Sequence, residues 1–322
     1  MDEEKIIVSI LCLAYNHEKY IKDALDSFIN QNVNFKYEII INDDCSTDST
    51  AQIIKEYAER YPQIIKPIFQ KENQYSKHRR MLIDILMPQA NGKYFAICEG
   101  DDYWTDTSKL QKQFDFMEAN TEYSMCVSNA FIVDSNKNKV GEINTVNDSS
   151  TLTCNDFILG GGEYVATNSI FSRMEYIEQL PTYFNDFSID YLWQIFLSSM
   201  GKTYCFKEPM VAYRINTGSS WTDKIMNDES KNININKEIV KKLKEIDECT
   251  NKKYDDAITK KITELQFNIF YLENDFEMMK QEPYLSYKKK LPKGKKIKIM
   301  IKEKMPFIFK ILKKEKLKIK HR

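Results

Sequence analysis

Short apolar runs alternate with helix-spaced segments along the first 120 residues of the chain. The apolar runs are typical of buried strands, and they are Ile6–Leu13, Tyr37–Ile41, Ile64–Phe69 and Tyr94–Cys98. The segments with helical spacing are Glu18–Asn30, Ser49–Arg60, Lys77–Gln89 and Lys109–Ala119. Strands that alternate with helices of this length predict βαβ units and a parallel sheet, hence an α/β fold.

Beyond residue 120 the alternation is less regular. The pattern predicts strands over Tyr123–Val133, Tyr164–Phe171, Thr203–Phe206 and Met210–Ile215, and a helix over Ser188–Met200. From Asp223 to Lys280 it is helical with weak periodicity. We therefore expect one domain over residues 1–222 with halves 1–120 and 121–222, a helical extension over 223–287 and a basic tail over 288–322.

Polar clusters follow three of the predicted strands. Tyr15 and Asn16 follow the first strand, residues 42–44 (Asn-Asp-Asp) end the second, and residues 99–102 (Glu-Gly-Asp-Asp) end the fourth. The carboxyl ends of strands are where open α/β sheets bind ligands. The three clusters therefore predict one ligand site at this edge.

The 99–102 cluster places three carboxylates within four positions. These charges repel one another, and a hard divalent cation with oxygen ligands, Mg²⁺ or Mn²⁺, would relieve the repulsion and could bridge to a phosphate. The alternative is a solvated acidic turn before the next helix.

Composition excludes several classes of protein. The nine glycines form neither GxGxxG nor GxxxxGK[ST], which argues against a Rossmann dinucleotide site and a P-loop. Three histidines and seven scattered cysteines without a CxxC argue against a zinc or disulfide framework. No apolar run reaches the roughly 20 residues of a membrane span, and the acidic start MDEEKIIVSI is not a signal peptide. We therefore expect a cytoplasmic protein.

The net charge of zero hides an asymmetry. Residues 288–322 carry 16 Lys or Arg against two acids, so the other residues form an acidic body with 31 basic and 45 acidic groups. Apolar residues recur at helical spacing within the tail, which predicts a basic amphipathic segment on an anionic membrane surface, here the inner face of the plasma membrane. A solvated tail or an acidic protein partner is the alternative. Nucleic-acid binding is not expected, because no recognisable module accompanies the tail.

Three segments taken together resemble the family 2 glycosyltransferases, which have the GT-A fold. They are VSILCLAYNHEKYIKDALDSFINQ, YEIIINDDCSTDST and ANGKYFAICEGDDYW, and the match covers about residues 5–120. The resemblance implies a Rossmann-like mixed, mostly parallel sheet flanked by helices, with nucleotide-sugar binding in residues 1–120 and the acceptor and catalytic base in 121–222. It implies inverting, metal-assisted transfer of a sugar from a UDP-sugar to a hydroxyl of a cell-surface glycan or lipid-linked saccharide. A non-catalytic nucleotide-sugar- or glycan-binding protein and a nucleotidyltransferase of similar fold are the alternatives.

The resemblance also implies roles for residues of the first half. Tyr15 falls at the base pocket, with its neighbour Asn16 as a further nucleotide-sugar contact, and Asp44, beside Asp43, falls where the family holds the nucleotide base. Residues 99–102 fall on the DXD-type motif: Glu99 and Asp101 would contact the nucleotide-sugar, and Asp101 and Asp102 would bind Mn²⁺ or Mg²⁺. Cys45 replaces the glycine usual in this motif.

In the second half Asp190 falls where the family has its general base, with Asp186 as the local rival. Arg214 could pair with a phosphate or with a core carboxylate, and Asn216 stands where a metal-binding histidine is often found. On the acceptor side the candidates are Trp104, Gly161 and Trp221. Trp104 could stack on a sugar or pack against the following helix.

Overall fold

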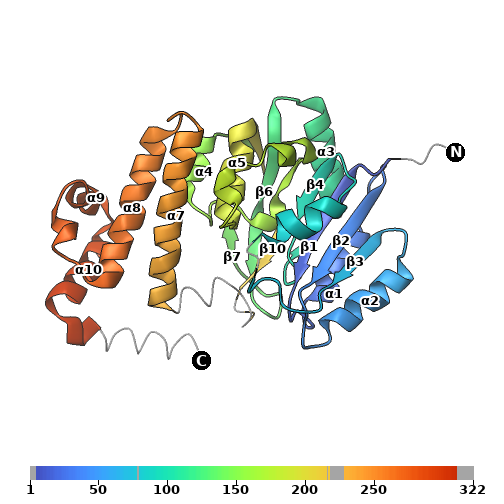
Figure 1. The fold of residues 1–322 in the computed structure, drawn as a ribbon, viewed down its shortest axis with the longest axis horizontal. Helices are drawn as coiled ribbons and strands as arrows, with labels where there is room; N and C mark the ends of the chain where they lie inside the picture. The colour runs from blue at the N-terminus through green and yellow to red at the C-terminus, as the bar shows by residue number, and fades with distance from the viewer. Residues whose placement is uncertain (1–4, 78–79, 216, 218–227, 310–322) are drawn as a thin grey trace. The chain divides into compact units, whose positions relative to one another are not determined.

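A computed structural model describes residues 5–77, 80–215, 217 and 228–309, and the chain divides into two compact units near residue 224 (Figure 1). The first unit is built on a sheet with strand order β3-β2-β1-β4-β9-β6-β10-β5, with β7 beside β6 and β8 beside β10. The strands are β1 (Val8–Ala14), β2 (Tyr37–Asp43), β3 (Ile65–Phe69), β4 (Tyr94–Ile97), β5 (Tyr103–Trp104), β6 (Tyr123–Val133), β7 (Lys139–Ile143), β8 (Ser150–Leu152), β9 (Phe171–Arg173) and β10 (Lys202–Arg214).

The strands β3, β2, β1 and β4 run parallel, so their carboxyl ends lie at one edge. Val8 of β1 pairs with Tyr37 of β2 and with Tyr94 of β4. All but one residue of β1 are buried, because elements cover both faces of the sheet. The helices of this unit are α1 (Ile21–Ile29), α2 (Thr50–Arg60), α3 (Lys109–Ala119), α4 (Cys154–Gly160) and α5 (Asp190–Met200).

The second half of the sheet differs from the predicted pattern. The predicted strands Thr203–Phe206 and Met210–Ile215 form the single strand β10, whose register shifts between Phe206 and Val211. That shift spans Pro209, which lacks the N–H that a regular ladder needs. The strands β7 and β8 and the helix α4 were not predicted, although Thr153 and Asp156 form a capping box at the start of α4.

For two other segments the predicted type of secondary structure is wrong. Tyr164–Phe171 is not a strand: it contains a 3₁₀ turn over Thr167–Ser169, and β9 begins at Phe171. The Ser169 hydroxyl donates to the carbonyl of Ala166, and such a local bond competes with strand pairing. Lys77–Gln89 is not one α-helix: within its described part, a π-helical turn over Leu82–Leu86 leads into a 3₁₀ turn over Met87–Gln89 that contains Pro88.

The second unit is helical. Its helices are α7 (Glu229–Cys249), α8 (Asp255–Glu273), α9 (Tyr284–Lys290) and α10 (Lys293–Lys304), and α7 and α8 lie side by side (Figure 1). Phe267, Met279 and Ile299 form a small core there. None of the helices in the described ranges is long and apolar enough to cross a membrane.

Candidate functional site

The loops that follow β1, β2 and β4 are bonded together at the carboxyl edge of the sheet. The backbone N–H of Asp44 donates to the carbonyl of Ala14 at 2.9 Å, and that of Gly100 donates to the carbonyl of Leu13 at 2.9 Å. The structure thus brings the three predicted polar clusters to one place.

Asn16 holds the first loop against the second. Its backbone N–H donates to Ser46 Oγ at 2.9 Å, and its side-chain carbonyl accepts from the Thr47 N–H at 2.8 Å. Asn16 has a positive φ of 56°, a conformation that asparagine tolerates better than most residues. The side chain of Tyr15 is 37% exposed at the same edge, so its ring is open to a ligand.

Asp43 and Asp44 are both buried but have different partners. Both oxygens of Asp44 are used within the protein, since Oδ1 accepts from the Gln74 N–H at 2.6 Å and Oδ2 from the Tyr75 N–H at 2.9 Å. Asp43 Oδ2 accepts from the Ser46 N–H at 3.1 Å, whereas Asp43 Oδ1 has no hydrogen-bond partner among the described residues. A buried oxygen without a donor fits a ligand N–H or hydroxyl. The geometry therefore favours Asp43 for the contact that the resemblance implied for Asp44.

Cys45 keeps the backbone conformation of the glycine that it replaces. Its φ is 62°, in the left-handed region where a side chain is strained. The loop geometry is therefore maintained at a cost in stability.

Replacing Cys45 with glycine should raise the free energy of unfolding by about 0.5–1 kcal/mol. The left-handed conformation costs a non-glycine residue roughly 1–2 kcal/mol, and the greater freedom of glycine in the unfolded chain offsets about half of this. Urea denaturation of the variant measures the change. The matched control is Cys249→Gly in α7, where glycine should lower stability. A Cys45→Gly protein less stable than wild type would contradict the assignment of strain.

Gly100 allows the acidic cluster to lie against the first loop. A Cβ at this position would come within 2.8 Å of Ile21 Cδ1 and 2.9 Å of His17 Nδ1, closer than side chains pack. Glycine has no Cβ, so the chain at residue 100 can pack closely against the first loop. The next residue, Asp101, then lies near that loop, with its Oδ2 3.8 Å from His17 Nε2.

The charge of Asp190, in the second half, acts on the acidic cluster of the first half at this edge. Asp190 is the first residue of α5, and Thr167 Oγ1 donates to its Oδ2 at 2.9 Å. Burial, then the charges of Asp190 and Asp101, raise the pKa of Glu99 well above its ordinary value. Burial, and then Asp101, likewise raise the pKa of Asp102, and partial desolvation raises that of Asp190, although this residue is exposed. The site therefore holds excess negative charge that a cation would relieve.

Replacing Glu99 with glutamine should stabilise the metal-free protein at pH 7–8 by on the order of 1–3 kcal/mol. The pKa of Glu99 is higher in the folded state than in the unfolded state. The free energy of unfolding therefore falls as the pH rises from the unfolded-state pKa through the folded-state pKa. Glutamine does not ionise, so the variant keeps the stability that wild type loses. The difference in free energy of unfolding between variant and wild type should vanish below about pH 4, where Glu99 is protonated in both the folded and the unfolded state.

Thermal unfolding from pH 4 to pH 8 with EDTA tests this prediction. The control is Glu163→Gln, which removes an acid from an exposed position of the same unit. An advantage that is independent of pH would show that the Glu99 charge is not the cause.

The donor set fits a metal that is completed by a ligand. No group of three His, Cys, Asp or Glu side chains suited to a metal is found among the described residues. Mg²⁺ and similar ions are usually held by one or two carboxylates together with substrate phosphates and water. Asp101 and the remaining oxygen of Asp102 offer these two carboxylates.

Arg214 is committed to the protein interior. Only 1% of it is exposed; its Nη2 donates to Asp23 Oδ2 at 2.8 Å and its Nε donates to the carbonyl of Asp101 at 2.7 Å. Its backbone N–H donates to Asp102 Oδ1 at 2.7 Å. Of the two roles left open for Arg214, the structure supports pairing with a core carboxylate. Asp23 itself was missed, because one acid in an amphipathic helix gives no signal.

Trp104 is 4% exposed and packs beneath the site. Its ring lies 4.8 Å from that of Phe28, the Lys109 amine lies 4.2 Å from the ring, and its Nε1 donates to the carbonyl of Asn168 at 3.0 Å. This agrees with the packing alternative and leaves no ring face open to a sugar.

Gly161 ends α4 with a φ of 82°, so its conformation explains the glycine there. Its neighbour Gly162 lies beside Tyr191 of α5. The acceptor-side candidate Trp221 and the possible metal ligand Asn216 lie outside the described residues.

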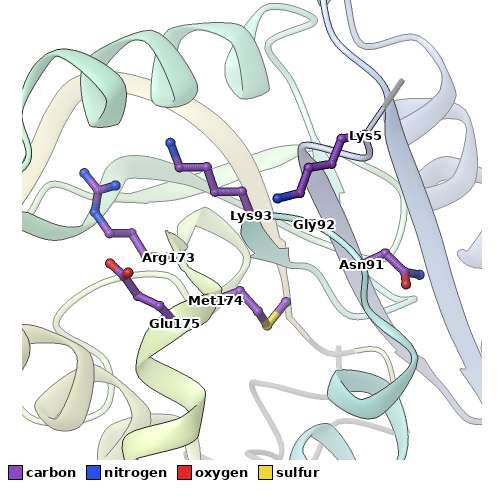
Figure 2. Close-up of a pocket in the computed structure, with 7 residues that line it drawn as sticks. All are labelled: Lys5, Asn91, Gly92, Lys93, Arg173, Met174 and Glu175. Atoms are coloured by element: carbon purple, nitrogen blue, oxygen red, sulfur yellow. The ribbon is translucent and has the colours of Figure 1, made fainter. Parts of the chain in front are cut away.

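A cavity of about 230 Å³ lies at the opposite edge of the sheet, near the amino ends of β1 and β4. Figure 2 shows Lys5, Lys93 and Arg173 among its lining residues. Two of these cations already have partners, since Arg173 Nη2 donates to the carbonyl of Met117 at 2.7 Å and Lys93 pairs with Glu118. This cavity is separate from the carboxyl-edge site.

Comparison with known proteins places this geometry in context. Residues 9–180 match the family described as Glycosyl transferase family 2. An uncharacterized protein of Mycobacterium tuberculosis, Rv1520, is 34% identical over 215 residues, which are 66% of this chain and 60% of the relative. Escherichia coli WfaP, a UDP-Glc:alpha-D-GlcNAc-diphosphoundecaprenol beta-1,3-glucosyltransferase, is 36% identical over 112 residues, which are 35% of this chain and 41% of WfaP. The chain thus spans less than two thirds of either relative.

Solved structures share the fold. S. aureus TarS 1-349 in complex with UDP superposes with a TM-score of 0.56 at 15% identity, covering 93% of this chain and 81% of that one. A mannosyltransferase of Pyrobaculum calidifontis in complex with GDP-Man and Mn²⁺ gives a TM-score of 0.53 at 12% identity, covering 94% and 88%. These likenesses confirm the predicted mixed α/β sheet flanked by helices, followed by C-terminal helices.

Proposed function

The chain belongs to glycosyl transferase family 2 and has its GT-A fold, and from this premise we propose that it is an inverting glycosyltransferase. It moves a sugar from a UDP-sugar to a hydroxyl of a cell-surface glycan or lipid-linked saccharide, with Mn²⁺ or Mg²⁺ bound. The observation that carries the proposal is that Asp190 interacts electrostatically with Glu99 of the acidic cluster, at the edge where Asp43 offers a free oxygen.

The nucleotide half of the proposed site recognises the donor. Asp43 Oδ1, buried and without a protein partner among the described residues, accepts a hydrogen bond from the base, and the exposed ring of Tyr15 lies at the same edge. Asp101 and Asp102 would hold the metal ion, which when bound neutralises the diphosphate and stabilises it as a leaving group. That UDP occurs in the TarS complex supports a uridine donor.

Asp190 is the proposed general base. Partial desolvation raises the pKa of this exposed carboxyl, which brings it nearer to the working pH of a base catalyst. Its carboxylate takes the proton of the acceptor hydroxyl as that oxygen attacks the anomeric carbon. A single displacement of this kind needs no enzyme nucleophile and inverts the anomeric configuration.

A transfer assay tests this function. The protein is incubated with UDP-sugars, Mn²⁺ and a panel of saccharide and lipid-linked acceptors, and nucleoside diphosphate release and product configuration are measured by NMR. We expect UDP release that depends on acceptor, and an inverted anomeric centre. Pyrophosphate release would instead indicate a nucleotidyltransferase, and donor binding without turnover would indicate a non-catalytic binding protein.

The basic C-terminal helices suit an acceptor at a membrane. WfaP acts on a diphosphoundecaprenol-linked sugar, which supports a lipid-linked acceptor here. On α10, Ile297 and Met300 are 53% and 47% exposed, and Lys293, Lys298 and Lys304 surround them. An exposed apolar stripe among lysines fits an anionic membrane surface, and we place the protein at the inner face of the plasma membrane.

Replacing Ile297 and Met300 together with glutamate should lower binding to vesicles that contain anionic lipid at least about 10-fold. The change removes apolar contact and adds two negative charges, and each charge near the surface is worth on the order of 1 kcal/mol. Vesicle sedimentation measures binding. Val140→Glu alters an apolar residue that is 56% exposed on β7 and should bind like wild type. Unchanged binding by the double variant would contradict the role of this stripe.

A further inference from the structure

A short turn beside the proposed base is held rigidly from the donor half of the sheet. The 3₁₀ turn Thr167–Ser169 precedes β9. Trp104 Nε1 donates to the carbonyl of Asn168 at 3.0 Å, and Gln113 Nε2 donates to the carbonyl of Ser169 at 2.9 Å. Trp104 lies two residues after the acidic cluster in sequence, so the turn is anchored to the segment that carries the proposed metal ligands.

The turn is also anchored to the second half of the sheet. Asn168 Nδ2 donates to the carbonyl of Ala212 in β10 at 2.8 Å, and Asn168 is only 2% exposed. Thr167 is the partly exposed member of the turn. The anchored backbone therefore fixes where the Thr167 hydroxyl lies.

The Thr167 hydroxyl makes one bond to Asp190. Oγ1 donates to Asp190 Oδ2 at 2.9 Å, and no hydrogen bond to Asp190 Oδ1 occurs among the described residues. The residue before Asp190, Ile189, provides no side-chain cap for α5. Within the described part of the chain, Thr167 is thus the hydrogen-bond partner that fixes the orientation of this carboxylate.

We propose that Thr167 is a positioning residue for Asp190: its hydroxyl holds Oδ2 and leaves Oδ1 to accept the proton of the incoming hydroxyl. This inference rests on the proposed function of Asp190 as the base. A single oriented oxygen matters for catalysis because proton transfer requires hydrogen-bond reach of the reacting group. Thr167 lies at the junction of the two halves, so it places the base relative to the donor site.

Two variants of the whole chain separate positioning from simple structural support. Thr167→Val keeps the shape and removes the hydroxyl, whereas Thr167→Ser keeps the hydroxyl. We expect Thr167→Val to lower kcat about 10- to 100-fold, the effect of losing one hydrogen bond to a charged group, with KM and Kd for the donor unchanged. Thr167→Ser should restore kcat to within about threefold of wild type.

The measurements are steady-state kinetics, donor binding by calorimetry and thermal unfolding of each variant. Wild-type kcat in Thr167→Val would overturn the inference, and so would equal losses in Thr167→Val and Thr167→Ser. A third outcome would also overturn the inference and show a structural role. In that outcome Thr167→Val loses donor affinity or folds poorly, and Thr167→Ser does not restore kcat. The proposed function is judged separately, since it stands if wild type transfers sugar and Asp190→Asn does not.

Discussion

Replacing Asp190 with asparagine should lower kcat about 10²- to 10⁴-fold while leaving donor affinity unchanged. Asparagine has nearly the same shape and can accept the Thr167 hydroxyl, but it cannot take a proton from the acceptor. The variant also removes a charge that raises the pKa of Glu99, so its folded state should be no less stable than wild type. The loss therefore isolates the chemical step.

Steady-state transfer and donor calorimetry measure the two quantities. Asp186→Asn is the matched control, because Asp186 lies four residues before Asp190, is exposed and was the rival candidate. It should keep kcat within about threefold of wild type. Near-normal transfer by Asp190→Asn would show that another group is the base, and a large loss in Asp186→Asn would point to that group.

Replacing Asp101 with asparagine should weaken donor binding at least about 100-fold in Mn²⁺ and remove its dependence on metal. Metal charge contributes several kcal/mol to a phosphate site, and each 1.4 kcal/mol is a factor of ten in Kd. Asp101 is partly exposed, and its charge raises the pKa values of Glu99 and Asp102. Removing that charge should stabilise the metal-free fold while disabling the site.

Calorimetry with and without EDTA measures this effect. Asp115→Asn is the control, because Asp115 is an exposed acid on α3 and the charge change is the same. It should bind donor like wild type. Wild-type affinity and metal dependence in Asp101→Asn would contradict the assignment of Asp101 to the metal.

The sequence predicted the parallel half of the fold because its signals are local. An apolar run that ends in a polar cluster marks each of β1, β2 and β4 in the sequence. Because these strands are parallel neighbours, residues 15–16, 42–44 and 99–102 come together at one edge of the sheet. The second half depends on contacts between residues far apart in sequence. The antiparallel strand β9, inserted between β4 and β6, has no such local signature.

The roles of residues within the site also depend on contacts between residues far apart in sequence, which local patterns do not predict. The resemblance identified both aspartates of the 43–44 pair, but only the structure shows that Asp44 bonds to the loop at Gln74 while Asp43 keeps a free oxygen. Thr167 was missed because a threonine in a short polar turn is an ordinary residue. Its importance arises from its place opposite Asp190, 23 positions along the chain.

The most direct test of the account is the stability of the protein with nucleotides and metals. Thermal unfolding is measured with nucleoside diphosphates and with UDP-, GDP-, CDP- and dTDP-sugars, each in Mn²⁺, Mg²⁺ or EDTA. A ligand at 100 times its Kd adds about 2.7 kcal/mol to the free energy of unfolding. We expect stabilisation by UDP and UDP-sugars with Mn²⁺ or Mg²⁺, and loss of this stabilisation in EDTA. No stabilisation by any nucleotide with either metal would contradict the account.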